Sequence, residues 1–180
     1  MKKAQSINLV IDASVARASG GEEAIHPTAM VTRNFLQAVL TICHKTVMTP
    51  AIRAEWDKHQ SGFARKWRRS MVARKKLVRL NVEERPDLRQ RVELGNISQG
   101  EKDAMLKDCH LIEAAINTDR RIISLDDAAR KLFVELSLSV TDIQDVLWVN
   151  PALDERQVMA WLEGAPNEAK WKLTHNSYSE

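Results

Sequence analysis

The chain has 180 residues, 44% of them hydrophobic and 28% charged, so it can bury its own core as one domain with room for an extension. Its two cysteines, Cys43 and Cys109, lack the Cys-x-x-Cys spacing of a zinc site and are too few for a disulfide framework, although a single bridge stays open. The apolar stretch that ends at Ile11 is too short for a signal-peptide core or a membrane span. We therefore expect a soluble protein of the reducing cytoplasm.

The first two predicted strands each lead to an acidic residue. Residues 9–11 form an apolar run that ends at Asp12. Residues 46–49 form a second short strand, and the helix that Pro50 opens carries Glu55. Between the two strands, an apolar repeat of about 3.6 residues predicts a helix.

The middle of the chain is strongly basic, although the formal charge of the whole chain is only +3. Residues 63–80 contain eight basic side chains and no acidic one. A helix through this segment would place Trp67 and Met71 on one stripe and spread the cations over the other faces. Such a helix suits contact with a phosphate backbone, and equally a solvated face or a docking surface for an acidic partner. The candidate nucleic-acid-binding residues are Arg65, Lys66, Arg68, Arg69, Arg74, Lys75 and Lys76.

A third acidic residue lies inside a well-marked helix. Ser98 and Glu101 have the spacing of a capping box, which predicts a helix start at this point. Further along the helix, Asp108 falls on the same stripe as Met105 and Ile112. An acid on a core-facing stripe is costly unless it is paired, binds a metal or lies at the edge of the core.

The last third contains another strand that ends in an acid. Residues 121–125 form a strand before Asp126, and a helix is predicted over residues 127–136. Residues 139–141 read as a last short strand, and residues 154–163 as a helix in the tail. We expect the tryptophans of this region to fold back on the domain, with a partner interface as the alternative. They are Trp148, Trp161 and Trp171.

Strands that alternate with helices favour the α/β class, here a three-layer α/β/α sandwich with a central parallel sheet. We expect the domain over residues 7–150 and an extension over residues 151–180. Ligands bind at the carboxyl edge of such sheets, where Asp12 and Asp126 would both emerge. Carboxylates that converge repel one another, which implies a divalent cation, and hard oxygen ligands suit Mg²⁺ or Mn²⁺.

Each acid also has a purely structural explanation. Asp12 and Asp126 are well placed to cap the helices that follow them. Glu55 has His59 as a neighbour one turn along its own helix, and Asp108 has basic residues nearby at the edge of the core. Only together do the four acids indicate a site for phosphodiester hydrolysis.

Four segments together resemble the PIN-domain nucleases in order, spacing and flanking residue types. They are residues 8–14, 49–55, 107–115 and 122–126. The resemblance implies a metal-dependent ribonuclease on a compact α/β/α sandwich, and many small members of the family are toxins of toxin–antitoxin pairs. By position, its catalytic acids correspond to Asp12, Glu55, Asp108 and Asp126 here.

The resemblance also assigns roles. Asp12, Asp108 and Asp126 would hold the metal, and Glu55 would complete the shell, hold a second ion or orient the attacking water. Ser124 would support the site. Asp127, which follows Asp126 directly, is a candidate substitute ligand on its position alone. The implied partners are an RNA substrate, an antitoxin or other protein, and a second copy of the chain. A binding module without catalysis, and DNA in place of RNA, remain alternative readings.

Overall fold

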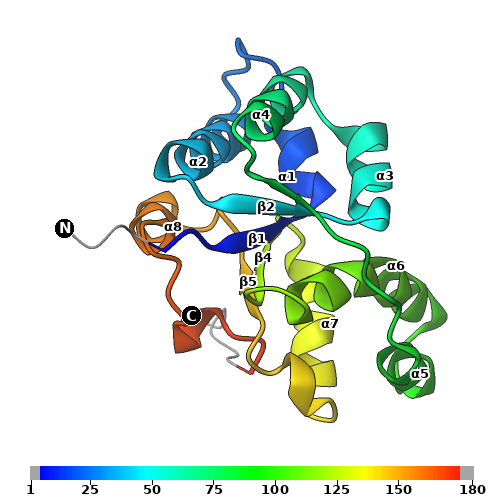
Figure 1. Cartoon of the computed structure of the whole chain (residues 1–180). Helices are drawn as coiled ribbons and strands as arrows, with labels where there is room; N and C mark the ends of the chain where they lie inside the picture. Colours follow the sequence, from blue (N-terminus) through cyan, green and yellow to red (C-terminus); the bar gives the residue numbers. More distant parts are fainter. Residues whose placement is uncertain (1–4, 175–180) are drawn as a thin grey trace.

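The computed structural model describes residues 5–174 and contains a five-stranded sheet in which every strand pair is parallel. The strand order is β3-β2-β1-β4-β5, with β1 in the centre (Figure 1). The strands are β1 (Asn8–Ile11), β2 (Lys45–Met48), β3 (Leu77–Arg79), β4 (Arg121–Ile123) and β5 (Leu147–Val149).

Eight α-helices surround the described sheet, and their bounds follow the sequence signals closely. Pro50 opens its helix as expected, and both halves of the predicted capping box are present at Ser98 and Glu101. The helices are α1 (Ala13–Ala18), α2 (Pro27–Ile42), α3 (Pro50–His59), α4 (Gly62–Ala73), α5 (Pro86–Leu94), α6 (Gln99–Ile116), α7 (Asp127–Ser137) and α8 (Glu155–Leu162), with short 3-10 turns at Thr141–Ile143 and Ala169–Trp171.

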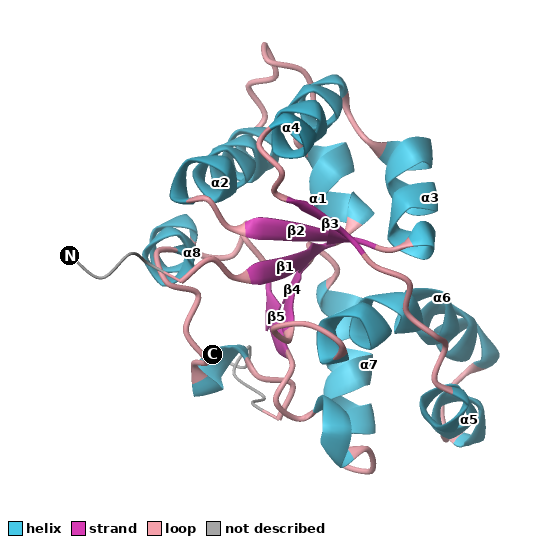
Figure 2. Ribbon diagram, in the orientation of Figure 1, coloured by secondary structure: helices cyan, strands magenta, loops and turns pink. Residues whose placement is uncertain are grey.

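Helices α1 to α4 lie on one side of the sheet, and α6 and α7 lie on the other (Figure 2). The chain builds β1, β2 and β3 outward in one direction and then returns to place β4 on the other side of β1. Because crossovers between parallel strands are right-handed, this reversal puts the later helices on the opposite face. The predicted three-layer α/β/α sandwich is confirmed, and its topological switch point lies between β1 and β4.

Two strands differ from the sequence prediction. The expected strand over residues 139–141 is wrong, because this stretch leads into a 3-10 turn and the last strand is Leu147–Val149. The basic helix is shorter than expected, because it ends at Ala73 and Lys75 has a φ of 56°. This left-handed residue turns the chain into β3, so the end of the basic segment is a strand at the edge of the sheet.

The C-terminal segment packs on the sheet and on α2. Trp148, Trp161 and Trp171 are all buried, which confirms the expectation that the tryptophans fold back. Lys172 forms an antiparallel bridge with Leu147 and so covers the outer edge of β5. The segment after Pro151 is therefore an integral part of the described structure.

A buried histidine links this segment to the start of β1. The backbone N–H of Ile7 donates to Nδ1 of His44 over 3.1 Å, and Nε2 of the same ring lies 2.7 Å from the carbonyl oxygen of Leu162. Because Nδ1 accepts, Nε2 carries the hydrogen, so the neutral ring joins the N-terminal residues to the end of α8.

The two cysteines are free thiols, Cys43 exposed and Cys109 buried, so the bridge left open by the sequence is not formed. Burial raises the pKa of the Cys109 thiol to about 12. Between residues 5 and 174, every helix is too short or too polar to cross a lipid bilayer.

Replacement of His44 tests the link between the two ends of the fold. His44→Leu keeps the bulk but leaves a buried backbone N–H and carbonyl without partners, which should lower the free energy of unfolding by about 2–3 kcal/mol. Urea unfolding followed by circular dichroism measures this loss. His26→Leu is the matched control, because His26 is exposed and makes no side-chain cap hydrogen bond, and it should change stability by less than about 0.5 kcal/mol. Equal stability of both variants would contradict the link.

Candidate acidic site at the switch point

Asp12 emerges at the carboxyl end of β1, beside β4. Its backbone N–H donates to the carbonyl oxygen of Ile123 over 2.9 Å, so the pairing of the two strands extends to this residue. Its side chain makes no capping hydrogen bond to α1, which rules out the structural explanation considered for it. The carboxylate is therefore directed away from the helix backbone.

Two serines orient the Asp12 carboxylate. Ser14 Oγ and Ser124 Oγ both donate to Oδ2 of Asp12, over 2.5 and 3.0 Å. Each hydroxyl also accepts a backbone N–H, that of Leu125 at Ser14 and that of Asp126 at Ser124. Both hydrogens point to the same oxygen, and Oδ1 accepts no hydrogen bond from the described residues. One carboxylate oxygen is thus held and the other is available to a ligand.

Asp126 combines two of the roles foreseen for it. Its Oδ1 accepts the backbone N–H of Ala129 over 2.8 Å and caps α7, so the structural explanation holds. The residue is exposed and also lines the pocket that contains Asp12. Asp127, expected as a substitute ligand, does not line this pocket and instead accepts the side-chain N–H of Asn150 over 2.9 Å.

Glu55 reaches the site because a tryptophan fixes α3 against β1. The next residue, Trp56, is fully buried, and its Nε1 donates to the carbonyl oxygen of Ile11 over 2.8 Å. The Trp56 ring stacks on Trp67 of α4, with centroids 5.9 Å apart. Glu55 also pairs with His59 over 3.5 Å, as its position on the helix suggested.

Asp108 comes from α6 and is the acid with the most unfavourable surroundings. Among the described residues, none donates a hydrogen bond to its carboxylate. Burial raises its pKa to about 7, and the negative charges of Asp12, Asp126 and Glu55 add to the effect while Lys107 opposes it. The four predicted acids therefore act on one another electrostatically, although they are far apart in the sequence.

The acids line a common pocket of about 210 Å³. The same pocket contains positively charged side chains that the sequence reasoning missed, Arg17 on α1 and Lys107 on α6. It also contains His110 of α6. Arg17 lies one turn after Ala13, the residue that follows Asp12 and begins α1. This position on the first turn after Asp12 is the signal that could have identified it.

The side chains as they stand are not arranged as a preformed metal centre. No group of three or more His, Cys, Asp or Glu residues within residues 5–174 is close enough to hold an ion together. The pocket thus gathers the acids, with Asp12 held by serines, Asp126 by a helix terminus and Glu55 by His59. A cation would have to draw the carboxylates closer or bind some of them through water.

The basic helix does not border this pocket. None of the seven predicted nucleic-acid-binding residues lines it, although all seven are described. Two of them already have acidic partners, because Lys66 pairs with Glu22 and Arg68 with Asp57, each over 2.7 Å. Lys75 and Lys76 follow the end of α4 and lead into β3.

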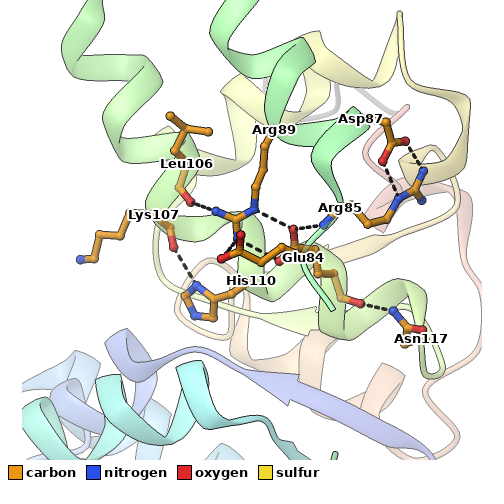
Figure 3. Close-up of polar contacts among 9 residues, drawn as sticks. Glu84, Arg85, Asp87, Arg89, Leu106, Lys107, His110 and Asn117 are labelled. Carbon is orange, nitrogen blue, oxygen red and sulfur yellow. Dashed lines mark hydrogen bonds and ion pairs between the residues drawn. The ribbon is translucent and has the colours of Figure 1, made fainter. Parts of the chain in front are cut away.

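An ion-pair network supports α6 next to the pocket (Figure 3). Glu113 of α6 is only 3% exposed and pairs with Arg89 of α5 over 2.9 Å. The same carboxylate accepts the backbone N–H of Arg85 over 2.8 Å. Figure 3 also shows His110, whose Nδ1 lies 2.7 Å from the carbonyl oxygen of Lys107. The network fixes the helix that carries Asp108.

Comparison of the chain with protein-family models, with curated proteins and with solved structures found no match.

The raised pKa of Asp108 predicts a gain in stability when its charge is removed. An unfolded aspartate ionises near its model value of 3.8, so the folded state is penalised as the pH rises from about 4 through about 7. Asp108→Asn should stabilise the metal-free protein at pH 8 by about 1–2 kcal/mol, less than the full shift implies because the carboxyl is partly exposed. Thermal unfolding in EDTA at pH 8 and pH 4 measures this difference.

Most of the gain should disappear at pH 4, where the folded carboxyl is protonated and the unfolded one, near its model value of 3.8, is only about half ionised. Asp103→Asn is the control on the same helix, because Asp103 is exposed and lies outside the pocket. A variant that is less stable than wild type at pH 8 would show that Asp108 has a stabilising partner.

Proposed function

We propose that the chain is a metal-dependent endoribonuclease of the PIN type, which hydrolyses phosphodiester bonds at the pocket between β1, β4, α3 and α6. The observation that carries this proposal is the convergence of four carboxylates at the switch point of a parallel sheet, where Asp108 is left without a hydrogen-bond partner among the described residues. Acids with structural roles alone would not be expected to gather in one pocket, because their negative charges repel one another.

The donor set fits Mg²⁺ or Mn²⁺. All the candidate ligand atoms are carboxylate oxygens, which these ions prefer to nitrogen or sulfur. Asp12 and Asp126 each use only one oxygen for internal hydrogen bonds, so the other is available. Mg²⁺ retains several waters and needs few direct protein ligands, which suits carboxylates that are gathered in a pocket without touching.

The residues have distinct roles in this proposal. Asp12, Asp108 and Asp126 hold the metal, and Glu55 lies beside them on α3, where His59 orients it. A bound divalent cation would polarise the scissile phosphate and lower the pKa of a coordinated water. Arg17 and Lys107 lie at the same pocket and supply positive charge for the phosphates on either side of the scissile bond.

Replacement of Asp12 tests the proposal most directly. Asp12→Asn retains an oxygen that can accept from Ser14 and Ser124, so the fold should persist while the ligand charge is lost. We expect cleavage of a mixed structured RNA pool in Mn²⁺ or Mg²⁺ to fall by at least about 100-fold. Cleavage should also be abolished by EDTA. The control is Asp103→Asn, which removes an acid of α6 outside the pocket and should cut at the wild-type rate.

Cleavage by the Asp12→Asn variant at the wild-type rate would overturn the proposed site. A single-stranded DNA substrate of the same sequence belongs in the same experiment, because phosphate contacts from Arg and Lys do not distinguish the sugar. Metal-dependent cleavage of DNA alone would keep the site and replace the substrate.

Metal binding can be measured without activity. A ligand that binds only the folded state stabilises it by RT ln(1 + [L]/Kd), about 2.7 kcal/mol at 100 times Kd. The wild-type melting temperature should therefore rise with added Mn²⁺ or Mg²⁺, and Asp12→Asn and Asp108→Asn should lose most of this rise. A rise that is equal in all three proteins would place the ion elsewhere.

Ser124 is a positioning residue in this proposal. Ser124→Ala removes one of the two hydrogen bonds to Asp12 Oδ2 but leaves every proposed ligand in place. Loss of such a supporting hydrogen bond costs about 10–100-fold in metal affinity or activity. The expected signature is a shift of the Mn²⁺ dependence of cleavage to higher concentration, with partial rescue by Ser124→Thr. A fall in rate with unchanged metal dependence would contradict this role.

The second candidate is a non-catalytic module that binds RNA or a protein. The observation that favours it is the position of the basic helix outside the acidic pocket. It predicts salt-sensitive RNA binding that Asp12→Asn leaves unchanged, together with no cleavage in any metal.

A further inference from the structure

The sheet has one covered edge and one open edge. Lys172 bridges Leu147 and covers β5 at one side. At the other side, β3 pairs only with β2 among the described strands. An uncovered edge strand presents unpaired backbone groups to any chain that can lie alongside it.

The register identifies which backbone groups are available. The carbonyl oxygen of Lys76 accepts from Thr46 over 2.9 Å, and the N–H of Leu80 donates to Met48 over 3.3 Å, so the residues of even number face β2. Successive residues of a strand alternate in direction, so the N–H and C=O groups of Leu77 and Arg79 point to the open side. Both residues are therefore ready to pair with an added strand.

The same two residues border a groove of about 650 Å³. Its walls come from β2, β3, α3 and α4 and combine apolar with charged side chains. The apolar part contains Met48, Pro50, Ala54, Val72, Leu77 and Leu80. Val72 is 46% exposed near the C-terminal end of α4, so an apolar side chain of the basic helix borders the groove.

The charge around the groove is positive. Arg53, Arg68 and Arg79 line it together with a single acid, Asp57. Asp57 already pairs with both Arg53 and Arg68, whose nitrogens lie 3.4 Å and 2.7 Å from its oxygens. The hydrogen bond from Arg68 is the main cause of the lowered pKa of Asp57. Arg79 is exposed and has no acidic partner among the described residues. A bound anion would therefore meet uncompensated positive charge beside the open strand.

We propose that β3 is a docking edge for an acidic, extended segment of a partner protein, which adds to the sheet as a sixth strand. Alternate apolar side chains of the segment enter the groove beside Val72 and Leu77, and its acidic side chains meet Arg79 and the basic residues of α4. Main-chain hydrogen bonds to Leu77 and Arg79 supply affinity, and the side chains supply specificity. This inference is independent of the proposed nuclease activity.

The observations favour this occupant over two others. A second copy of the chain would bring a surface of the same positive charge against this one, which is unfavourable. Single-stranded nucleic acid stacks its bases on exposed aromatic rings, and the groove has none. The tryptophans of this region, Trp56 and Trp67, are buried beneath α3 and α4.

The experiment begins with a displayed library of random 12-residue peptides selected against the whole protein in EDTA. We expect enrichment of sequences in which Asp or Glu alternates with Leu, Val or Ile. The consensus peptide, labelled with fluorescein, is then titrated with protein and followed by fluorescence anisotropy. Enrichment of basic or featureless peptides, or no enrichment above background, would overturn the proposal.

Variants locate the bound peptide. Arg79→Glu should weaken binding by at least about 10-fold through charge reversal. Arg79→Pro removes an N–H that faces away from β2, so the sheet should survive while strand addition is lost. Lys131→Glu is the matched control, because Lys131 is an exposed cation of α7 outside the groove, and it should bind like wild type. Melting temperatures within a few degrees of wild type confirm that each variant is folded.

A chemically modified peptide separates strand addition from charge attraction. N-methylation of alternate residues blocks main-chain donors without changing charge, and it should abolish binding in one of the two registers. Unchanged binding of both methylated peptides would overturn the strand-addition geometry. Displacement of the peptide by a single-stranded RNA, with tighter RNA binding that Arg79→Glu weakens equally, would assign the surface to nucleic acid instead.

Discussion

The parallel pairing of β1 with β4 is the constraint on which the acidic site depends. The paired residues of these strands are 112 positions apart in the chain, and only their pairing brings Asp12 beside Ser124. The hydrogen bond from the Asp12 N–H to the carbonyl oxygen of Ile123 continues the pairing one residue past β1. It therefore fixes the backbone from which the Asp12 carboxylate projects. Because strand order reverses at this pair, neighbouring helices diverge and leave room for a pocket.

The pocket also carries an energetic conflict that the rest of the fold must offset. Asp108 lies one turn from the buried Met105 and Ile112, in a place where an apolar residue would pack without penalty. The network of Arg89 and Glu113 holds the same helix from its other side, so α6 cannot rotate to bring Asp108 into solvent. Local sequence choices that oppose stability in this way are typical of functional sites in otherwise consistent folds.

The features that the sequence predicted correctly depend mostly on residues close together in the chain. The Ser98 capping box, Pro50 at a helix start and the strand before Asp12 depend on neighbours within a few residues, and all three are present. The convergence of the acids could be predicted too, because parallel strands must end at a common edge.

What the sequence did not predict depends on long-range contacts. β3 and β5 are short, and they become strands because β2 and β4 offer an edge for them to pair with. The burial of Glu113 is a further example, because its partner Arg89 comes from another helix and only the fold brings the two together. The basic segment predicted positive charge correctly, but only the fold shows that its helix lies away from the acidic pocket.

Helix α3 separates two surfaces of opposite character. Glu55 faces the acidic pocket, whereas Arg53 and Asp57, each two positions away and so about 200° around the helix, face the basic groove. A third hollow connects the two surfaces, because it shares Thr49, Pro50 and Asn81 with the groove and His110 with the pocket. A chain bound along β3 that continued past Asn81 would therefore approach His110, which lines the pocket with Asp108. The shared residues Thr49 and Pro50 lie at the N-terminus of α3, so such a chain would contact the helix that carries Glu55.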